Sequence, residues 1–187
     1  MLSSVLGAYE PHSTWGFGNR HCCPGLLYTR RMTSKLVDDF YRALASRDGD
    51  AMAECYHDDI VFQDPAFGEL KGKDAGDMWR MLCSSDTALT VTHTVATTTD
   101  ASAEASWVAE YTFSATGRQV RNEVTARMKL KDGKIVEHID SFGFWKWSSQ
   151  ALGLPGKLLG WTPFMKHKVQ SEARKKLSTF QAAISQM

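Results

Sequence analysis

The chain has 187 residues, of which 43% are hydrophobic and 23% charged, enough for one compact domain with a substantial core. No stretch approaches the roughly 18 apolar residues that a membrane-spanning helix needs, and 20 aromatic residues argue against a disordered chain. The net charge of +1 conceals three parts: residues 1–31 carry +2, residues 32–145 carry −7 and residues 146–187 carry +6. The acidic middle part disfavours nucleic-acid binding.

Residues 1–32 are expected to be a leader that is flexible or removed. The segment is poor in acidic residues and ends in Arg30-Arg31, as organellar targeting peptides do. Its glycines and prolines, however, interrupt any continuous amphipathic helix. We therefore expect a cytoplasmic protein, with organellar targeting by residues 1–31 as the alternative. The two other predicted parts are a domain over 33–145 and a basic tail over 146–187.

Three helices and a short hairpin are expected before residue 87. Apolar residues at helical spacing predict a first helix that ends near Asp48-Gly49, then a short helix, and a third helix around Trp79. Between the second and third helices, residues 58–65 alternate as a strand, with Ile60 and Asp64 on one face. The expected helix caps are Thr33 or Ser34, Asp50 and Asp74.

From residue 87 the hydrophobic period changes to two, which predicts strands. The expected strands cover residues 87–99, 103–114, 118–131 and 134–145, with Asp132-Gly133 as a strong hairpin signal. Because the connections are short, the four strands should form an antiparallel meander. Helices followed by a meander indicate an α+β fold.

Two strings carry a family resemblance. FYRALASRDGDAMAECYHDDIVFQDPAFGELKGKDA and the sheet ending KDGKIVEHIDSFGFW resemble the nuclear transport factor 2-like superfamily, with SnoaL-like polyketide cyclases and ketosteroid isomerases as the nearest relatives. The resemblance covers about residues 34–145. It implies a cone-shaped, curved antiparallel sheet packed against three N-terminal helices, with a pocket at the wide end of the cone. A C-terminal amphipathic helix would follow this domain.

The resemblance also places individual residues. Asp64 falls at the position of the general base of ketosteroid isomerases, whereas Phe40 and Ala126 fall at the positions of the two oxyanion donors. Neither Phe40 nor Ala126 can donate a hydrogen bond from its side chain, and loss of one such donor typically costs about 10²–10³ in rate. Steroid isomerisation by that mechanism is therefore not expected, although the fold is.

Strand alternation places further polar residues on the inner face with Asp64. On the last strand these are His138 and Asp140. The predicted catalytic group is Asp64 as base, His138 as its proton partner and Asp140 orienting the imidazole, as in the Asp–His pairs of dehydratases in this superfamily. The predicted substrate-binding residues are Phe40, Tyr56, Trp79, Tyr111, Asn122 and Phe142.

Two classes of function stay open. One is general acid/base chemistry of isomerase, cyclase or dehydratase type on an apolar carbonyl or hydroxyl compound. The other is a non-catalytic module for ligand binding or dimerisation, because an Asp before a Pro often only satisfies the N–H groups of a turn. A homodimer through the outer sheet face is expected. No cofactor or metal is predicted, since the four cysteines and the histidines lack zinc-site spacing.

The tail over residues 146–187 reads as a basic amphipathic helix. Its apolar stripe is expected to pack on the chain's own domain, with contact to an anionic membrane surface as the less favoured alternative. The stripe comprises Met165, Val169, Ala173, Leu177, Phe180 and Ile184. A second apolar cluster is expected to cover the mouth of the cone or to protect the sheet, and consists of Leu158, Leu159, Trp161, Phe164 and Met165.

Overall fold

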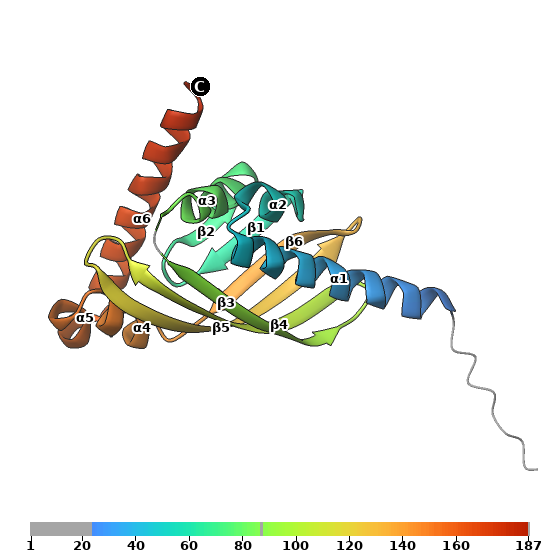
Figure 1. Ribbon diagram of the computed structural model, residues 1–187, viewed down its shortest axis with the longest axis horizontal. Helices are drawn as coiled ribbons and strands as arrows, with labels where there is room; N and C mark the ends of the chain where they lie inside the picture. The colour runs from blue at the N-terminus through green and yellow to red at the C-terminus, as the bar shows by residue number, and fades with distance from the viewer. Residues whose placement is uncertain (1–23, 87, 187) are drawn as a thin grey trace, which may run out of the picture.

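The computed structural model describes residues 24–86 and 88–186 (Figure 1). Most of the predicted leader, with Cys22 and Cys23, lies outside these residues. The helices are α1 Pro24–Ser46, α2 Gly49–Glu54, α3 Lys73–Cys83, α4 Phe144–Ala151, α5 Leu154–Leu159 and α6 Pro163–Ile184. The strands are β1 Tyr56–Asp64, β2 Gly68–Lys71, β3 Leu89–Thr98, β4 Ser102–Phe113, β5 Arg118–Lys131 and β6 Lys134–Ser141. Within the described part, no helix combines the length and hydropathy that crossing a bilayer requires.

One curved sheet contains all six strands, in the order β2-β1-β6-β5-β4-β3. The strands β3 to β6 pair antiparallel in sequence order, which confirms the predicted meander. The β5–β6 turn has positive φ at both Asp132 and Gly133, as a two-residue hairpin requires. Strand β1 joins the free edge of β6 in parallel, with Phe62 opposite His138. This pairing places Asp64 on the same face and at the same end of the sheet as Asp140.

The inner face of the sheet packs against the N-terminal helices. Figure 1 shows α1 running across the sheet, and its contacts are mainly with β3 and β4. In α1, Val37, Phe40 and Tyr41 are fully buried. On β4 and β5 the buried residues, which include Trp107 and Ala126, occur at every second position, and most of the remaining residues of the same face are half-buried, as the alternation predicts. The α+β cone expected from the sequence is therefore confirmed.

Four predicted boundaries are wrong. The first helix begins at Pro24, so that Thr33 is a buried residue of its interior and does not stand at its N-terminus. Asp48, not Asp50, caps α2 by accepting a hydrogen bond from the N–H of Ala51. At α3 the capping position belongs to Gly72, and Asp74 lies in the first turn. The last strand ends at Ser141, after which Gly143 is the N-cap of α4 and residues 144–145 are helical.

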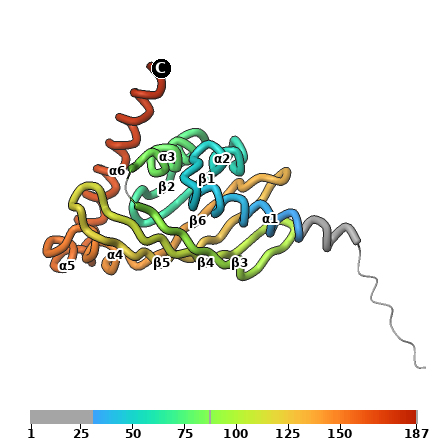
Figure 2. The backbone as a smooth tube through the Cα atoms, in the orientation of Figure 1, coloured from blue at the N-terminus to red at the C-terminus, as the bar shows by residue number. Residues whose placement is uncertain are grey.

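After β6 the chain folds back along its own domain through α4, α5 and α6 (Figure 2). Strand β6 ends before β5 does, and α4 lies along the edge of β5 that is left unpaired. There the side-chain amide of Gln150 accepts a hydrogen bond from the backbone N–H of Arg121 and donates one to the backbone carbonyl of Arg121. Helix α6 lies against β2 and α3, with Arg174 donating to the carbonyl of Phe67 and Gln181 to Asp74. The apolar stripe thus packs on the domain, and its members Met165 and Leu177 are buried.

Candidate functional site

A chain of hydrogen bonds runs through the interior of the cone. The indole N–H of Trp79 donates to the Tyr56 hydroxyl, 2.8 Å away, and that hydroxyl lies 2.8 Å from Nδ1 of His138. On the other side of the imidazole, Nε2 lies 3.1 Å from Oδ1 of Asp140, which also accepts from the indole N–H of Trp107. Four elements, α3, β1, β6 and β4, therefore meet at one buried polar group.

The partners assign the protons along this chain. An indole N–H can only donate, so the oxygen of Tyr56 is the acceptor from Trp79. The proton of Tyr56 then has Nδ1 of His138 as its acceptor, which leaves Nε2–H to donate to Asp140. With the imidazole neutral, every N–H and O–H group in this chain of hydrogen bonds has an acceptor. Burial also raises the pKa of the Tyr56 phenol well above its usual value, so the hydroxyl keeps its proton.

Aromatic rings pack around the imidazole of His138, whose two nitrogens are used in the chain of hydrogen bonds. The rings of Phe40 and Phe62 each contact the imidazole edge-on, with centroids 5.3 Å away, and Trp79 stacks on it. His138 has no exposed surface. Of the predicted site residues, Phe40, Tyr56, Trp79, His138 and Asp140 therefore do lie together, as one packed core network.

Asp64 lies at the end of β1, apart from this network. Its Oδ1 accepts from the N–H groups of Ala66 and Phe67, and so holds the turn after Pro65. Among the hydrogen bonds of the described residues, none joins Asp64 to His138. Burial raises the pKa of the Asp64 carboxyl to about 7; the bond from the N–H of Phe67 opposes this shift and the charge of Asp140 adds to it.

Helix α4 covers the end of the inner face at which Val120 and Tyr111 lie. Trp147 of α4 is buried against the inward-facing Val120 and donates from its indole N–H to the Tyr111 hydroxyl, 2.9 Å away. Phe142 also packs against Trp147. Asn122 is half-buried on β5, opposite Ala109. The covering residue is thus Trp147, whereas Leu158, Leu159, Trp161 and Phe164, which were expected to cover the mouth or the sheet, are exposed.

Tyr41 is a polar residue of the interior that the sequence pattern did not select. It follows Phe40 on α1, but both side chains are fully buried, because the inner face of the sheet surrounds α1 broadly enough to take two adjacent positions. Its ring stacks on His93. Within the described part, its hydroxyl is the one buried side-chain polar atom without a hydrogen-bond partner. The charge of Asp140 adds to burial in raising the pKa of Tyr41, so the two groups lie near each other.

Replacing Tyr41 with phenylalanine is expected to raise the free energy of unfolding by about 1 kcal/mol. The change removes an unpaired buried hydroxyl and keeps the packing of the ring. Urea denaturation would measure the effect. Tyr56→Phe is the matched control, since it removes a hydroxyl with two partners and should cost about 1–3 kcal/mol. An equal loss of stability in both variants would contradict this account of Tyr41.

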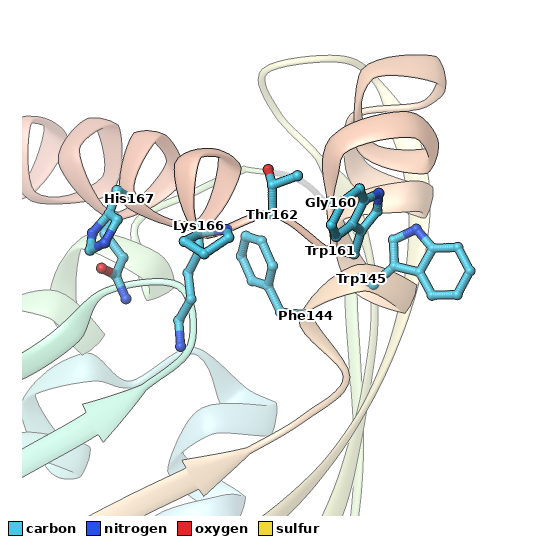
Figure 3. A pocket seen from close by; sticks show the side chains of 9 residues that line it. Phe144, Trp145, Gly160, Trp161, Thr162, Lys166 and His167 are labelled. Atoms are coloured by element: carbon cyan, nitrogen blue, oxygen red, sulfur yellow. The ribbon is translucent and has the colours of Figure 1, made fainter.

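Two pockets of the described surface lie outside the interior of the cone. One, of about 560 Å³, is bounded by α4 and the start of α6, and its lining includes Phe144, Trp161 and Lys166 (Figure 3). The other lies between β2, α3 and α6 and is lined by Glu69 and Arg174 among others. In the described residues no three His, Cys, Asp or Glu side chains are grouped so that they could hold a metal ion.

Comparisons with known proteins agree with this architecture. Residues 37–138 match the sequence family of the SnoaL-like domain. A candidate polyketide cyclase from Silicibacter sp. TM1040 is 17% identical, with a TM-score of 0.57 over 64% of this chain and 95% of its own. An LEH-like epoxide hydrolase from M. tuberculosis is 18% identical, with a TM-score of 0.52 over 73% and 98%.

A third similar structure is a protein from Catenulispora acidiphila with a ketosteroid isomerase-like fold, solved in complex with trimethylamine. It is 16% identical, with a TM-score of 0.55 over 70% of this chain and 99% of its own. At these identities the likeness concerns the fold alone. No curated protein matches the sequence.

Proposed function

Because the chain belongs to the SnoaL-like domain family, we propose that it binds an apolar small molecule at the mouth of its cone and exchanges a proton with it through Asp64. One observation supports the proposal: Asp64 lies at the end of β1, partly exposed, and burial raises the pKa of its carboxyl to about 7. Such a group accepts and donates a proton with equal ease near neutral pH. The general class is acid/base chemistry on a carbonyl or hydroxyl compound.

The other inner residues receive positioning roles in this proposal. His138 and Asp140 fix Tyr56 and the two tryptophans of the buried chain, and do not themselves touch the compound. Burial raises the pKa of Asp64, and the negative charge of Asp140 adds to this shift. Tyr111 and Phe142, which pack around Trp147, would supply apolar contacts to the compound, and Trp147 has to move aside when it enters.

Proton abstraction can be tested without knowledge of the natural substrate. A thermal-shift screen of steroids, polyketides and fatty acids would first identify compounds that bind. Each bound ketone would then be incubated with the protein in D₂O, and its deuterium content followed by mass spectrometry. We expect Asp64→Asn to retain the thermal shift, because its amide oxygen can still accept from the turn, and to lose exchange by about 10²–10⁴-fold.

Asp58→Asn is the matched control for that experiment. Asp58 lies on the same strand and is exposed, so its replacement should leave both binding and exchange unchanged. Exchange at the wild-type rate in Asp64→Asn would rule out Asp64 as the proton-transferring group.

A specific observation also favours the second candidate, a non-catalytic ligand-binding or dimerisation module. Aromatic side chains fill the interior, and Trp147 covers one end of the inner face. The outer face of β5 presents exposed charged side chains, Arg121, Glu123 and Arg127, to a second copy. Arg121 and Glu123 also form ion pairs with Glu110 and Lys146 within the chain. Ligands that bind wild type and Asp64→Asn equally, with no exchange in either protein, would support this alternative.

A further inference from the structure

The surface around α5 carries six large apolar side chains that are exposed to solvent. Leu154 and Trp161 are each 72% exposed. We call this group the α5 apolar patch; it comprises Trp145, Leu154, Leu158, Leu159, Trp161 and Phe164. Exposed apolar groups of this size and density usually mark a surface that meets a partner.

The patch is held in a fixed shape. The indole N–H of Trp145 donates to the carbonyl of Lys157, and that of Trp161 donates to the carbonyl of Leu158. Both indoles are therefore anchored to the last turn of α5 while their ring faces remain open. Helix α5 itself is packed closely on α4, since a Cβ on Gly156 would lie 1.8 Å from the carbonyl oxygen of Ser148. The patch needs no rearrangement to present its rings.

The chain segment that carries the patch has basic residues and no acidic ones. Residues 144–168 contain no acidic residue, and the tail over 146–187 has seven basic residues against Glu172 alone. Lys157 lies within the patch, and Lys166 and Lys168 follow it on α6. None of the ion pairs in the described part involves these three lysines. The body over residues 32–145 carries −7, so the molecule is strongly dipolar.

A pocket beside the patch also combines exposed apolar rings with positive charge. Figure 3 shows the rings of Phe144, Trp145 and Trp161 at this pocket together with Lys166 and His167 of α6. Its volume of about 560 Å³ is in the range of small-molecule sites. Aromatic walls next to a cation suit an amphiphile with a negatively charged head.

We propose that the α5 apolar patch docks on the surface of a bilayer that contains anionic phospholipids. The leucines and Phe164 enter the boundary between headgroups and acyl chains, where tryptophan rings such as Trp145 and Trp161 are also favourably placed. Lys157, Lys166 and Lys168 meet the lipid phosphates. An anionic surface attracts the tail and repels the acidic body, so the molecule attaches with α5 toward the bilayer.

Charge also decides between a bilayer and a second copy of the chain. A symmetric dimer through this surface would place each patch, with its lysines, against its own copy. The two positively charged rims would then face each other without an acidic partner in residues 144–168. An anionic lipid surface supplies the missing negative charge, and also accepts apolar side chains.

Vesicle flotation with the full chain tests the proposal. We expect the protein to float with phosphatidylcholine vesicles that contain phosphatidylserine, to remain in solution with pure phosphatidylcholine vesicles, and to be released by salt. The double variant Leu154→Ser/Leu158→Ser should weaken the partition coefficient by about tenfold or more, because two exposed leucines are lost from the contact. Lys157→Glu/Lys166→Glu should weaken it similarly.

The controls are matched in residue type. Leu82→Ser alters an exposed leucine on α3, and Lys134→Glu an exposed lysine of the body; both should stay within about twofold of wild type. Absence of flotation with phosphatidylserine vesicles would overturn the proposal, as would equal losses in the patch variants and their controls. A dimer by analytical ultracentrifugation that Leu154→Ser/Leu158→Ser dissociates, with no vesicle binding, would identify a second copy as the occupant instead.

Discussion

Replacing His138 with alanine is expected to lower the free energy of unfolding by about 3–5 kcal/mol. The change empties the space between Phe40, Phe62 and Trp79, which enclose the imidazole completely. It also removes a partner from the buried Tyr56 hydroxyl and from the buried Asp140 carboxyl. Both the cavity and the unpaired polar groups lower the free energy of unfolding. Urea denaturation followed by tryptophan fluorescence would measure the loss.

Two further variants separate the cavity from the hydrogen bonds. His57→Ala is the control for loss of an imidazole; His57 lies near the surface and pairs with exposed Asp59 and Asp132, so its replacement should cost about 0.5 kcal/mol. Tyr56→Phe in the His138→Ala background should cost less than in wild type, since the hydroxyl has already lost its acceptor. If His138→Ala were no more harmful than His57→Ala, the buried chain would not be a stabilising network.

The sheet was predictable because strand alternation is a local signal. On β5 the alternation of Val120, Val124 and Ala126 with charged residues fixes which side faces the helices, and a shift of one residue would bury Arg121 and Arg127. The same rule placed His138 and Asp140 inward and together. The Asp132-Gly133 turn sets the pairing of Lys131 with Lys134 and of Leu130 with Ile135, but an irregularity between Lys129 and Leu130 shifts the rest of the β5–β6 register by one residue.

The partners of the inner residues were not predictable, because they come from elements far apart in the chain. The sequence pointed to a contact between Asp64 and His138, but Tyr56 lies 82 residues before His138 and occupies Nδ1 instead. Trp107, on β4, was recognised as inward-facing but not as a donor to Asp140. Sequence spacing indicates a face of the sheet; it does not indicate which of several polar side chains on that face meet.

The start of the tail was also predicted wrongly, since helix α4 begins within a pattern that is typical of a strand. Trp145 and Trp147 alternate as they would on a strand, yet they lie on a helix with about 100° between successive residues. Because Trp145 and Trp147 are two residues apart on this helix, their rings point in nearly opposite directions. Trp147 packs on the inner face of the sheet beside Val120, and Trp145 belongs to the α5 apolar patch. One short helix therefore connects the proposed lipid surface with the proposed ligand site.

The stability of the protein is expected to fall as the pH rises from about 4 to about 7, through the titration of Asp64. Folding raises the pKa of this carboxyl from 3.8 to about 7, mainly by burial. Between these values the folded state binds a proton that the unfolded state has released. The contribution of Asp64 to the free energy of unfolding is therefore fully present below pH 3.8. As the pH rises from 3.8 to about 7, this contribution falls by about 1.4 kcal/mol per pH unit, or about 4 kcal/mol in total.

Asp64→Asn isolates this effect, because an amide keeps the turn acceptor and does not titrate. Denaturation of both proteins between pH 4 and 8 should show wild type losing stability relative to Asp64→Asn up to about pH 7, and no further change above it. Asp58→Asn, on the exposed side of the same strand, should retain the wild-type slope. Parallel pH profiles for wild type and Asp64→Asn would mean that Asp64 is already ionised at pH 4 in the folded state. It could not then act as the acid and base that the proposed function requires near neutral pH.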